Sequence, residues 1–271
     1  MLIEVDNLSK IYKTKLSLIK SRGESIKAVD NISFNIDSGD VVGLVGESGC
    51  GKSTLSRLIM RLEKPTNGYI KYNDKDIWAL EREEIKGFRK SCQVIFQDTM
   101  TSLNPNIKVL DSLMEPLNNH YKIMRKEKIK KIEDIICFAN LKEDILNKYP
   151  LDISGGERQR INICRALLLE PKFLICDEII SSLDVCTQAS ILNMIKKLNS
   201  FNDMGVLFIS HDISAVKYLC SKIMVMYKGG IVETIDNEDN GYKIKHPYTS
   251  QLISSVPINN PNKRINEKIV I

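Results

Sequence analysis

The sequence predicts an α/β fold built around a parallel sheet, and three observations lead to this prediction. From residue 41 onward, short apolar runs such as Val41–Val45 alternate with segments that are apolar at helical spacing, such as 54–62. A glycine-rich string joins these two segments. Residues 2–36 instead alternate apolar and polar side chains, which predicts a small antiparallel sheet. The later alternation of strands and helices favours a parallel sheet with helices on both of its faces.

The first strands are predicted at 2–12 and 28–36, on either side of an exposed basic loop at 13–27. Gly39-Asp40 is predicted to be a turn. The remaining strands are predicted at 41–45, 69–72, 92–96, 173–176, 206–210, 223–226 and 231–234, and further helices at 54–62, 155–169, 188–198 and 213–220.

Residues 107 to about 150 are predicted to be helical and contain the basic run Lys122–Lys131. We interpret about 98–160 as a helical subdomain inserted into the α/β core. The basic run is typical of a solvated helix face, and a contact with a partner or with lipid headgroups is the alternative. The domain is predicted to span 1–257, and the polar tail 258–271 is predicted to be flexible.

Composition narrows the class of protein. The chain has 271 residues with 43% hydrophobic and 27% charged residues, and its net charge is +5. These values suit one large soluble α/β domain, or a core with a small second domain, and do not demand a nucleic-acid partner. No apolar run approaches the roughly 18–20 residues that span a bilayer, and the N-terminus does not resemble a signal peptide. We therefore expect a cytoplasmic protein without a transmembrane segment.

The seven cysteines are scattered and include no C-x-x-C pair, so neither a disulfide framework nor a zinc site is indicated. Cys50 differs from the others because it lies in the glycine-rich string, at the expected start of a helix. A helix N-terminus can lower the pKa of a thiol. We therefore hypothesise that alkylation of Cys50 inhibits the protein, although a tolerated small residue is the simpler interpretation.

The glycine-rich string G-E-S-G-C-G-K-S from Gly46 to Ser53 fits the phosphate-binding loop pattern G-x-x-x-x-G-K-[ST]. The expected strand before it and helix after it supply the context that this motif requires. Backbone N–H groups of the loop would bind phosphates, Lys52 would reach the β- and γ-phosphates, and Ser53 would ligate Mg²⁺. The predicted ATP contacts in this region are Gly46, Glu47, Ser48, Gly49, Cys50, Gly51, Lys52, Ser53 and Thr54.

Two carboxylates, Asp177 and Glu178, follow the apolar run 173–176. A buried parallel strand presents such residues at the carboxyl edge of the sheet, where ligands of α/β proteins bind. We expect Asp177 to hold Mg²⁺ and Glu178 to orient the water that attacks the γ-phosphate. A pair of helix-capping carboxylates is the alternative interpretation.

The string I-S-G-G-E-R-Q-R begins at Ile153 and predicts the start of a helix. Ser154 and Glu157 have the spacing of a capping box. Gly155 and Gly156 leave bare N–H groups at the helix start, which can receive a phosphate.

Together with the phosphate loop, this string resembles the L-S-G-G-Q signature of ATP-binding-cassette (ABC) ATPases. The other motifs of that family follow in the expected order: Gln97 resembles the Q-loop glutamine, Ser182-Leu183-Asp184 the D-loop, and His211 the switch histidine. Tyr12 is similar to the aromatic residue that stacks on adenine. The resemblance covers residues 2–257. It implies an ABC nucleotide-binding domain, with a RecA-like core, an antiparallel β subdomain and an inserted helical subdomain.

The resemblance also implies roles and partners. Gln97 would be catalytic and a Mg²⁺ ligand, and His211 would contact the γ-phosphate. Two cassettes would enclose two ATP molecules head to tail, so that Ser154, Gly155, Gly156 and Glu157 contact ATP held by the partner chain. The implied partners are a second ATPase chain, paralogous or identical, two transmembrane permeases and an extracytoplasmic binding protein, at the cytoplasmic face of the membrane. The cofactors would be ATP and Mg²⁺.

Further strings, including His246-Pro247-Tyr248-Thr249, resemble the peptide and nickel importer branch of this family. Ile153 and Glu157 depart from the usual leucine and glutamine of the signature. Ile179 replaces the proline of most peptide-type members, and the tail lacks cysteine, so these two features favour nickel, free or chelated, over di- or oligopeptides as cargo. A soluble ABC-type ATPase acting on nucleic acid or ribosomes, and an exporter subunit, are the alternatives.

Overall fold

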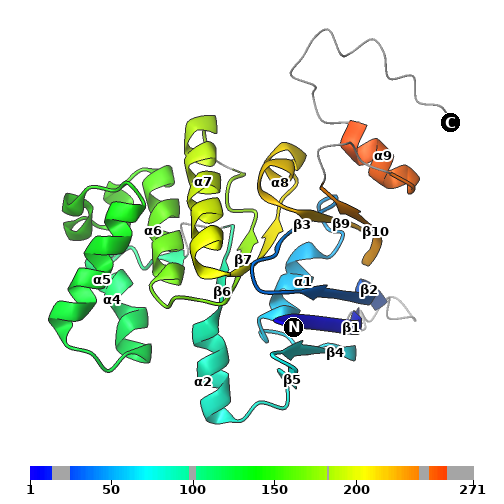
Figure 1. Cartoon of the computed structure of the whole chain (residues 1–271), viewed down its shortest axis with the longest axis horizontal. Helices are drawn as coiled ribbons and strands as arrows, with labels where there is room; N and C mark the ends of the chain where they lie inside the picture. The colour runs from blue at the N-terminus through cyan, green and yellow to red at the C-terminus, as the bar shows by residue number, and fades with distance from the viewer. Residues whose placement is uncertain (14–24, 98–101, 182, 238–243, 255–271) are drawn as a thin grey trace, which may run out of the picture.

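A computed structural model describes residues 1–13, 25–97, 102–181, 183–237 and 244–254. Within these ranges the strands form two sheets (Figure 1). The smaller sheet is antiparallel, in the order β2-β1-β4-β5, and contains β1 (Ile3–Lys13), β2 (Ser25–Ile36), β4 (Asn67–Tyr72) and β5 (Lys75–Asp76). The predicted antiparallel sheet is confirmed. Its predicted loop 13–27 falls largely outside the described residues.

The larger sheet has the order β10-β9-β3-β8-β7-β6. Its strands are β3 (Val41–Val45), β6 (Cys92–Ile95), β7 (Phe173–Asp177), β8 (Gly205–Ile209), β9 (Lys222–Tyr227) and β10 (Gly230–Asp236). Neighbouring strands from β6 to β9 pair in parallel, and β10 pairs antiparallel to β9. The carboxyl ends of the parallel strands therefore share one edge, as the sequence predicts.

The helices are α1 (Lys52–Ile59), α2 (Arg82–Ser91), α4 (Val109–His120), α5 (Arg125–Phe138), α6 (Gly155–Leu167), α7 (Val185–Asn202), α8 (Ile213–Leu219) and α9 (Pro247–Ser254), with 3-10 turns at Glu143–Asn147 and Pro150–Asp152. Helices α4, α5 and α6 lie together on one side of the molecule (Figure 1). Helices α2 and α9 are absent from the prediction. Helix α1 ends before residue 62 because the chain turns at Arg61, whose φ is 56°.

The large sheet divides the interior into two hydrophobic clusters. Val41 and Val45 of β3 belong to one cluster, and Val42 and Leu44 belong to the other. Successive side chains of a strand point to opposite faces, so the buried strand packs on both sides. One cluster joins the sheet to α1 and to the antiparallel sheet, and the other joins it to α4–α8. The helical segment therefore packs on the core of the parallel sheet.

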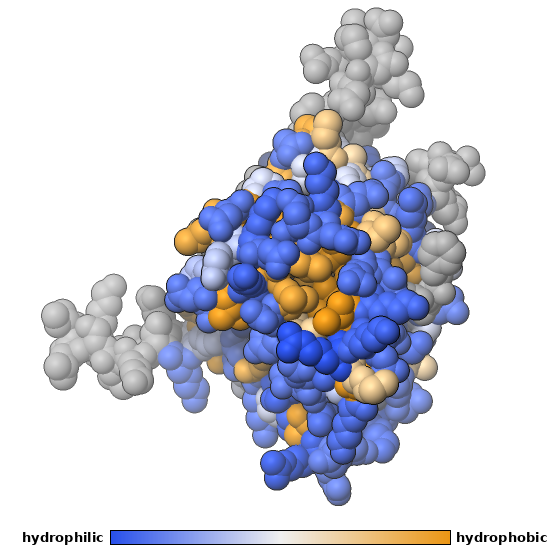
Figure 2. Space-filling view, turned by 90° about the vertical axis from the view of Figure 1, so that its left-hand side faces the viewer, coloured by the Kyte–Doolittle hydropathy of each residue, from blue (hydrophilic) through white to orange (hydrophobic). Residues whose placement is uncertain are grey.

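The side of the molecule formed by α4 and α5 is mostly hydrophilic, with a small apolar area at its centre (Figure 2). The basic run predicted to be a solvated face lies in and before α5. Lys128 Nζ donates to Asn118 Oδ1 over 2.8 Å, and Lys131 Nζ lies 2.5 Å from Glu170 Oε1. In the part of the chain that the structure describes, no helix is long and apolar enough to cross a membrane.

Candidate active site

The carboxyl edge of the large sheet gathers the predicted site residues from four neighbouring strands. The phosphate loop follows β3, His211 follows β8, Asp177 and Glu178 end β7, and Gln97 follows β6. These residues lie far apart in the sequence and become neighbours because the four strands pair in parallel in the order β3-β8-β7-β6. This strand order brings these residues to one edge of the sheet.

The phosphate loop is packed on one side and open on the other. A Cβ at Gly51, where φ is +114°, would lie 2.0 Å from the carbonyl oxygen of Ala28 in β2. A Cβ at Gly46 would lie 2.2 Å from the carbonyl oxygen of Met226 in β9. A Cβ at Gly49 would meet nothing within 4 Å. The loop therefore rests on β2 and β9, and its glycines allow that close approach.

Lys52 begins helix α1 and is buried. Its Nζ donates to the carbonyl oxygens of Gly46 and Glu47, over 2.7 and 2.9 Å. The ammonium thus lies at the loop itself, where it would meet a bound phosphate. The first N–H groups of a helix have no partner within the helix and favour an anion. The geometry fits the predicted binding of a phosphate group.

Asp177 combines a buried carboxylate with an unpaired oxygen. The residue is 5% exposed, and its Oδ1 has no hydrogen-bond partner among the described residues. Burial raises the pKa of this carboxyl, while a hydrogen bond with Ser53 acts in the opposite direction. A carboxylate and a hydroxyl are hard oxygen donors of the kind that Mg²⁺ prefers.

These two side chains fit Mg²⁺ as part of its coordination shell. The described residues contain no group of three or more His, Cys, Asp or Glu side chains that could hold a metal alone. At phosphate loops, Mg²⁺ usually takes its remaining ligands from nucleotide phosphates and water.

Two motif residues, Gln97 and His211, converge on one carboxylate oxygen of Glu178. Gln97 Nε2 donates to Glu178 Oε2 over 3.4 Å, and His211 Nδ1 lies 3.2 Å from the same oxygen. The backbone of Glu178 has a φ of 51°, and its N–H donates to the carbonyl oxygen of Ile209 over 2.9 Å. The left-handed turn at the strand end thus carries the carboxylate beside Gln97 and His211. The carboxylate side chain is 20% exposed, so solvent can reach it.

The predicted capping box at α6 is confirmed. Ser154 Oγ accepts from the Glu157 N–H over 3.2 Å, and Glu157 Oε2 accepts from the Ser154 N–H over 2.9 Å. The backbone hydrogen bond from Ser154 lowers the pKa of the Glu157 carboxyl. Gly156 packs closely on α7, because a Cβ there would lie 2.9 Å from Thr187 Cγ2.

The N-terminus of α6 faces outward. Ser154 and Gly155 are exposed. Among the described residues, no hydrogen bond or ion pair connects this string to the phosphate loop of the same chain. The contact of these residues with ATP stays a prediction.

Tyr12 lies on β1, and its hydroxyl donates to Glu63 Oε2 over 2.5 Å. Lys10 Nζ lies 5.2 Å from the ring centroid. The side chain also interacts with Thr54 and Arg57 of α1, so it lies beside the helix that follows the phosphate loop. Stacking on adenine stays a prediction. Of the predicted D-loop, Asp184 caps α7 by accepting from the Thr187 N–H over 3.0 Å, and Ser182 lies outside the described residues.

Burial counts against the hypothesis that Cys50 is reactive, and the effect of its alkylation stays a prediction. The residue is 8% exposed, and burial raises the pKa of its thiol, although Lys52 Nζ lies 3.9 Å from Sγ and acts in the opposite direction. Desolvation of the thiolate outweighs the favourable charge. Cys50 is therefore a small buried residue of the loop.

Sequence reasoning missed one residue that contacts the phosphate loop. The hydroxyl of Tyr248 in α9 accepts a hydrogen bond from the Glu47 N–H over 3.0 Å. The string His246-Pro247-Tyr248-Thr249 is noticeable in the sequence, but nothing local connects it to a loop 201 residues away.

Comparison with known proteins agrees with this geometry. A model of the ABC transporter family matches residues 29–181, more than half of the chain. The chain therefore belongs to the ABC transporter family, and it is an ATPase of that family.

Individual relatives agree with the family assignment. The oligopeptide transport ATP-binding protein OppF of Streptococcus mutans is 43% identical over 261 residues, which cover 96% of this chain and 83% of OppF. The oligopeptide transport ATP-binding protein AppF of Bacillus subtilis is 38% identical over 272 residues, covering 100% of this chain and 83% of AppF.

Solved structures show the same fold. The dimeric ABC transporter cassette MJ0796 superposes with a TM-score of 0.78 at 29% identity, covering 88% of this chain and 99% of that chain. A dimer of the same cassette in a post-hydrolysis state, bound to ADP and Pi, also has a TM-score of 0.78, at 28% identity. The predicted α/β fold of an ABC nucleotide-binding domain is confirmed.

Proposed function

We propose that the protein is the ATP-hydrolysing subunit of an importer for di- or oligopeptides, at the cytoplasmic face of the membrane. The observation that carries the catalytic part is the convergence of Gln97 and His211 on Glu178 at the sheet edge that also holds the phosphate loop. The transport part rests on OppF and AppF, both of which are named for oligopeptide transport.

In the proposed reaction, the loop N–H groups and Lys52 bind the phosphates of ATP. Asp177 and Ser53, with Gln97, would hold Mg²⁺, which neutralises phosphate charge when bound. Glu178 orients the attacking water, and its carboxylate can accept a proton from that water. His211 lies against the same carboxylate and would contact the γ-phosphate, so it can keep water and phosphate in line.

We further propose that two ATPase chains associate head to tail. The start of α6 is exposed at Ser154 and Gly155, which leaves it accessible to a second chain and supports a site shared between chains. The related cassette MJ0796 is described as dimeric. The second chain in this proposal is a paralogue, and an isolated preparation would form the homodimer.

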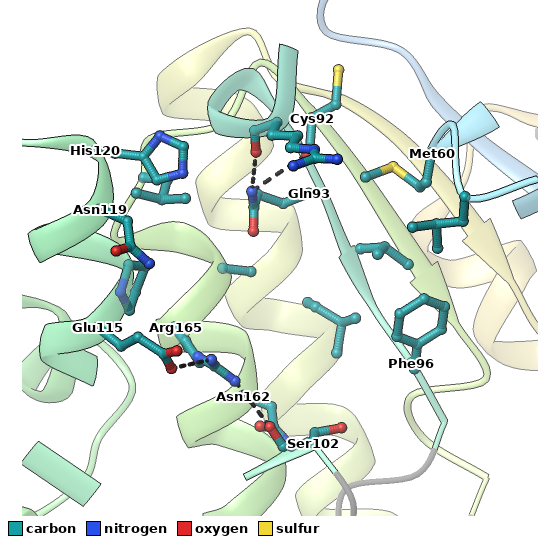
Figure 3. A pocket seen from close by; sticks show the side chains of 17 residues that line it. Met60, Cys92, Gln93, Phe96, Ser102, Glu115, Asn119, His120, Asn162 and Arg165 are labelled. Atoms are coloured by element: carbon teal, nitrogen blue, oxygen red, sulfur yellow. Dashed lines mark hydrogen bonds and ion pairs between the residues drawn. The ribbon is translucent and has the colours of Figure 1, made fainter. Parts of the chain in front are cut away.

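A groove beside Gln97 offers a site for the transmembrane subunits. The hollow of about 480 Å³ lies between β6, α4 and α6 (Figure 3). Arg165 connects two sides of this groove, because it donates to the Ser102 carbonyl oxygen over 2.9 Å and to Glu115 Oε2 over 2.7 Å. Phe96 is exposed in it, and the buried Asn162 presents an Nδ2 without a hydrogen-bond partner among the described residues.

A groove lined by both apolar and polar side chains, with one unpaired amide, suits a helix end that offers a carbonyl oxygen. We propose that each permease inserts such a helix here, next to Gln97. The substitution Phe96→Arg should release the permeases during purification while ATP binding is retained. Retained permeases would contradict this docking site.

Peptide is preferred over nickel as the cargo. The departure that favours nickel, Ile179, has a packing explanation, because its side chain is 3% exposed within the cluster that covers β7 and α7. The preference for peptide rests on OppF and AppF, which are both named for oligopeptide transport. The cysteine-free tail lies outside the described residues. An extracytoplasmic binding protein would select the peptide.

Uptake in cells lacking this chain tests the proposal. Radiolabelled tripeptide and radiolabelled nickel should be compared in the deletion strain, with wild type and Glu178→Gln supplied in trans. We expect peptide uptake to be lost, restored by wild type and not restored by Glu178→Gln. Loss of nickel uptake with intact peptide uptake would contradict the assignment of cargo.

A further inference from the structure

The phosphate loop is supported by a part of the chain that contains none of the ATP-binding motifs described above. The carbonyl oxygen of Met226 lies against Gly46, and the Gly229 N–H donates to the Cys50 carbonyl oxygen over 3.0 Å. Both contacts come from β9 and the turn that follows it. The β9–β10 hairpin therefore supports the packed side of the loop together with β2.

Helix α9 adds to this support through one side chain. The ring of Tyr248 stacks on Tyr227 at the end of β9, with centroids 4.3 Å apart and an interplanar angle of 33°. From this position its hydroxyl accepts the Glu47 N–H over 3.0 Å. The contact is directional, because an aromatic platform on one side fixes where the hydroxyl points.

The position of α9 is itself fixed by the hairpin. Glu233 of β10 accepts the Lys245 N–H over 2.6 Å and the His246 N–H over 3.2 Å, at the start of the helix.

Burial raises the pKa of the Tyr248 phenol, so the hydroxyl is neutral at physiological pH and keeps its proton. A neutral hydroxyl accepts the N–H without placing a negative charge beside a site for phosphates.

We propose that Tyr248 is a positioning residue of the phosphate loop, and that through its bond to Glu47 helix α9 and bound ATP stabilise each other. The inference rests on the proposed role of the loop in binding ATP. The hydrogen bond from the Glu47 N–H to Tyr248 fixes the first turn of the loop. The N–H groups that follow then point toward the phosphate site before ATP binds. Because coupling between two sites is reciprocal, ATP must then also hold α9 in place.

The test compares Tyr248→Phe with Tyr227→Phe. Each change removes one hydroxyl from the same stacked pair, but only the first removes the bond to the loop. We expect Tyr248→Phe to raise the KM for ATP about fivefold, the equivalent of roughly 1 kcal/mol and of one ordinary hydrogen bond, with kcat within about twofold. Tyr227→Phe should leave both constants within about twofold. An unchanged KM in Tyr248→Phe would overturn the inference.

A double-mutant cycle assigns the effect to this contact. Glu47→Pro removes the donating N–H and leaves Tyr248 intact, and Glu47 is absent from the residues with positive φ. In the Glu47→Pro background, Tyr248→Phe should have no further effect on KM. A second fivefold rise would show that Tyr248 acts by another route and would reject the proposal.

Hydrogen exchange measures the reciprocal effect. A non-hydrolysable ATP analogue with Mg²⁺ should slow amide exchange in α9 of the wild type and of Tyr227→Phe, and should not slow it in Tyr248→Phe. Slowing retained in Tyr248→Phe would refute the coupling. A wild-type protein that hydrolyses no ATP would contradict the proposed function. If the wild type hydrolyses ATP and Tyr248→Phe has the same KM and the same amide exchange, only the inference about Tyr248 fails.

Discussion

Replacing Glu178 by glutamine is the sharpest test of the proposed reaction. The substitution keeps the size of the side chain, and its amide oxygen can still accept from Gln97 or His211, which lie 3.4 and 3.2 Å from Glu178 Oε2. It removes the negative charge and the ability to take a proton. Positioned acid–base groups contribute about 10²–10⁴ in rate. Because the carboxylate is mostly buried, we expect a loss of about 10³, or roughly 4 kcal/mol in the barrier.

The assay is phosphate release by the protein together with its partner ATPase chain, alongside the affinity for a fluorescent ATP analogue. The affinity should change by less than about threefold, because the phosphate loop does not involve Glu178. Glu170→Gln is the matched control, since it makes the same chemical change at an exposed carboxylate paired with Lys131. Turnover above a tenth of the wild type in Glu178→Gln would refute the role of Glu178. Loss of ATP affinity would instead show that it binds nucleotide.

Three further results are expected. Asp177→Asn should stabilise the nucleotide-free protein by about 1 kcal/mol at pH 7.5, because it removes a buried charge with one unpaired oxygen, and should abolish the stabilisation by Mg²⁺ and ATP. Burial raises the pKa of Asp177 in the folded protein. The gain in the free energy of unfolding should therefore be complete above that pKa and absent at pH values below the ordinary pKa of aspartate. Urea unfolding of both proteins at several pH values measures this difference. Gly51→Ala should cost about 3 kcal/mol or more, and Gly49→Ala about 1 kcal/mol, because both residues have positive φ but only the first meets a backbone oxygen; equal costs in urea unfolding would contradict the packing described for the loop. Brief treatment with N-ethylmaleimide should modify the exposed cysteines, leave Cys50 intact by mass spectrometry and preserve ATPase activity.

The elements that could be predicted from the sequence are those specified by local patterns. The strand at Val41–Val45 is entirely apolar, and Ser154 with Glu157 forms a capping box whose partners are three residues apart. Parallel pairing then places Gln97, Glu178 and His211 at one edge, although their distances depend on the turns after each strand. The elements between these motifs were less predictable.

Helix α2 shows why. Phe88 is its only buried residue in the described structure, and its other positions are mainly charged, so it lacks the apolar stripe that identifies a helix in a sequence. A capping box between Glu81 and Glu84 starts it instead. The contact of Tyr248 with Glu47 was unpredictable for a different reason, because only the folded chain brings α9 to the loop. At Cys50, burial opposed the effect of the helix N-terminus, and burial is not visible in the sequence.

The outward position of the α6 start has a genetic consequence for a head-to-tail pair. In the proposed pair, each composite site would take its phosphate loop from one chain and its Ser154 from the other. Suppose one chain carries a lesion at Lys52 and the other a lesion at Ser154. Both lesions then fall in the same site, and the second site remains whole. When a single chain carries both lesions, each site loses one part. Two defects in different subunits should therefore complement better than the same two defects in one subunit.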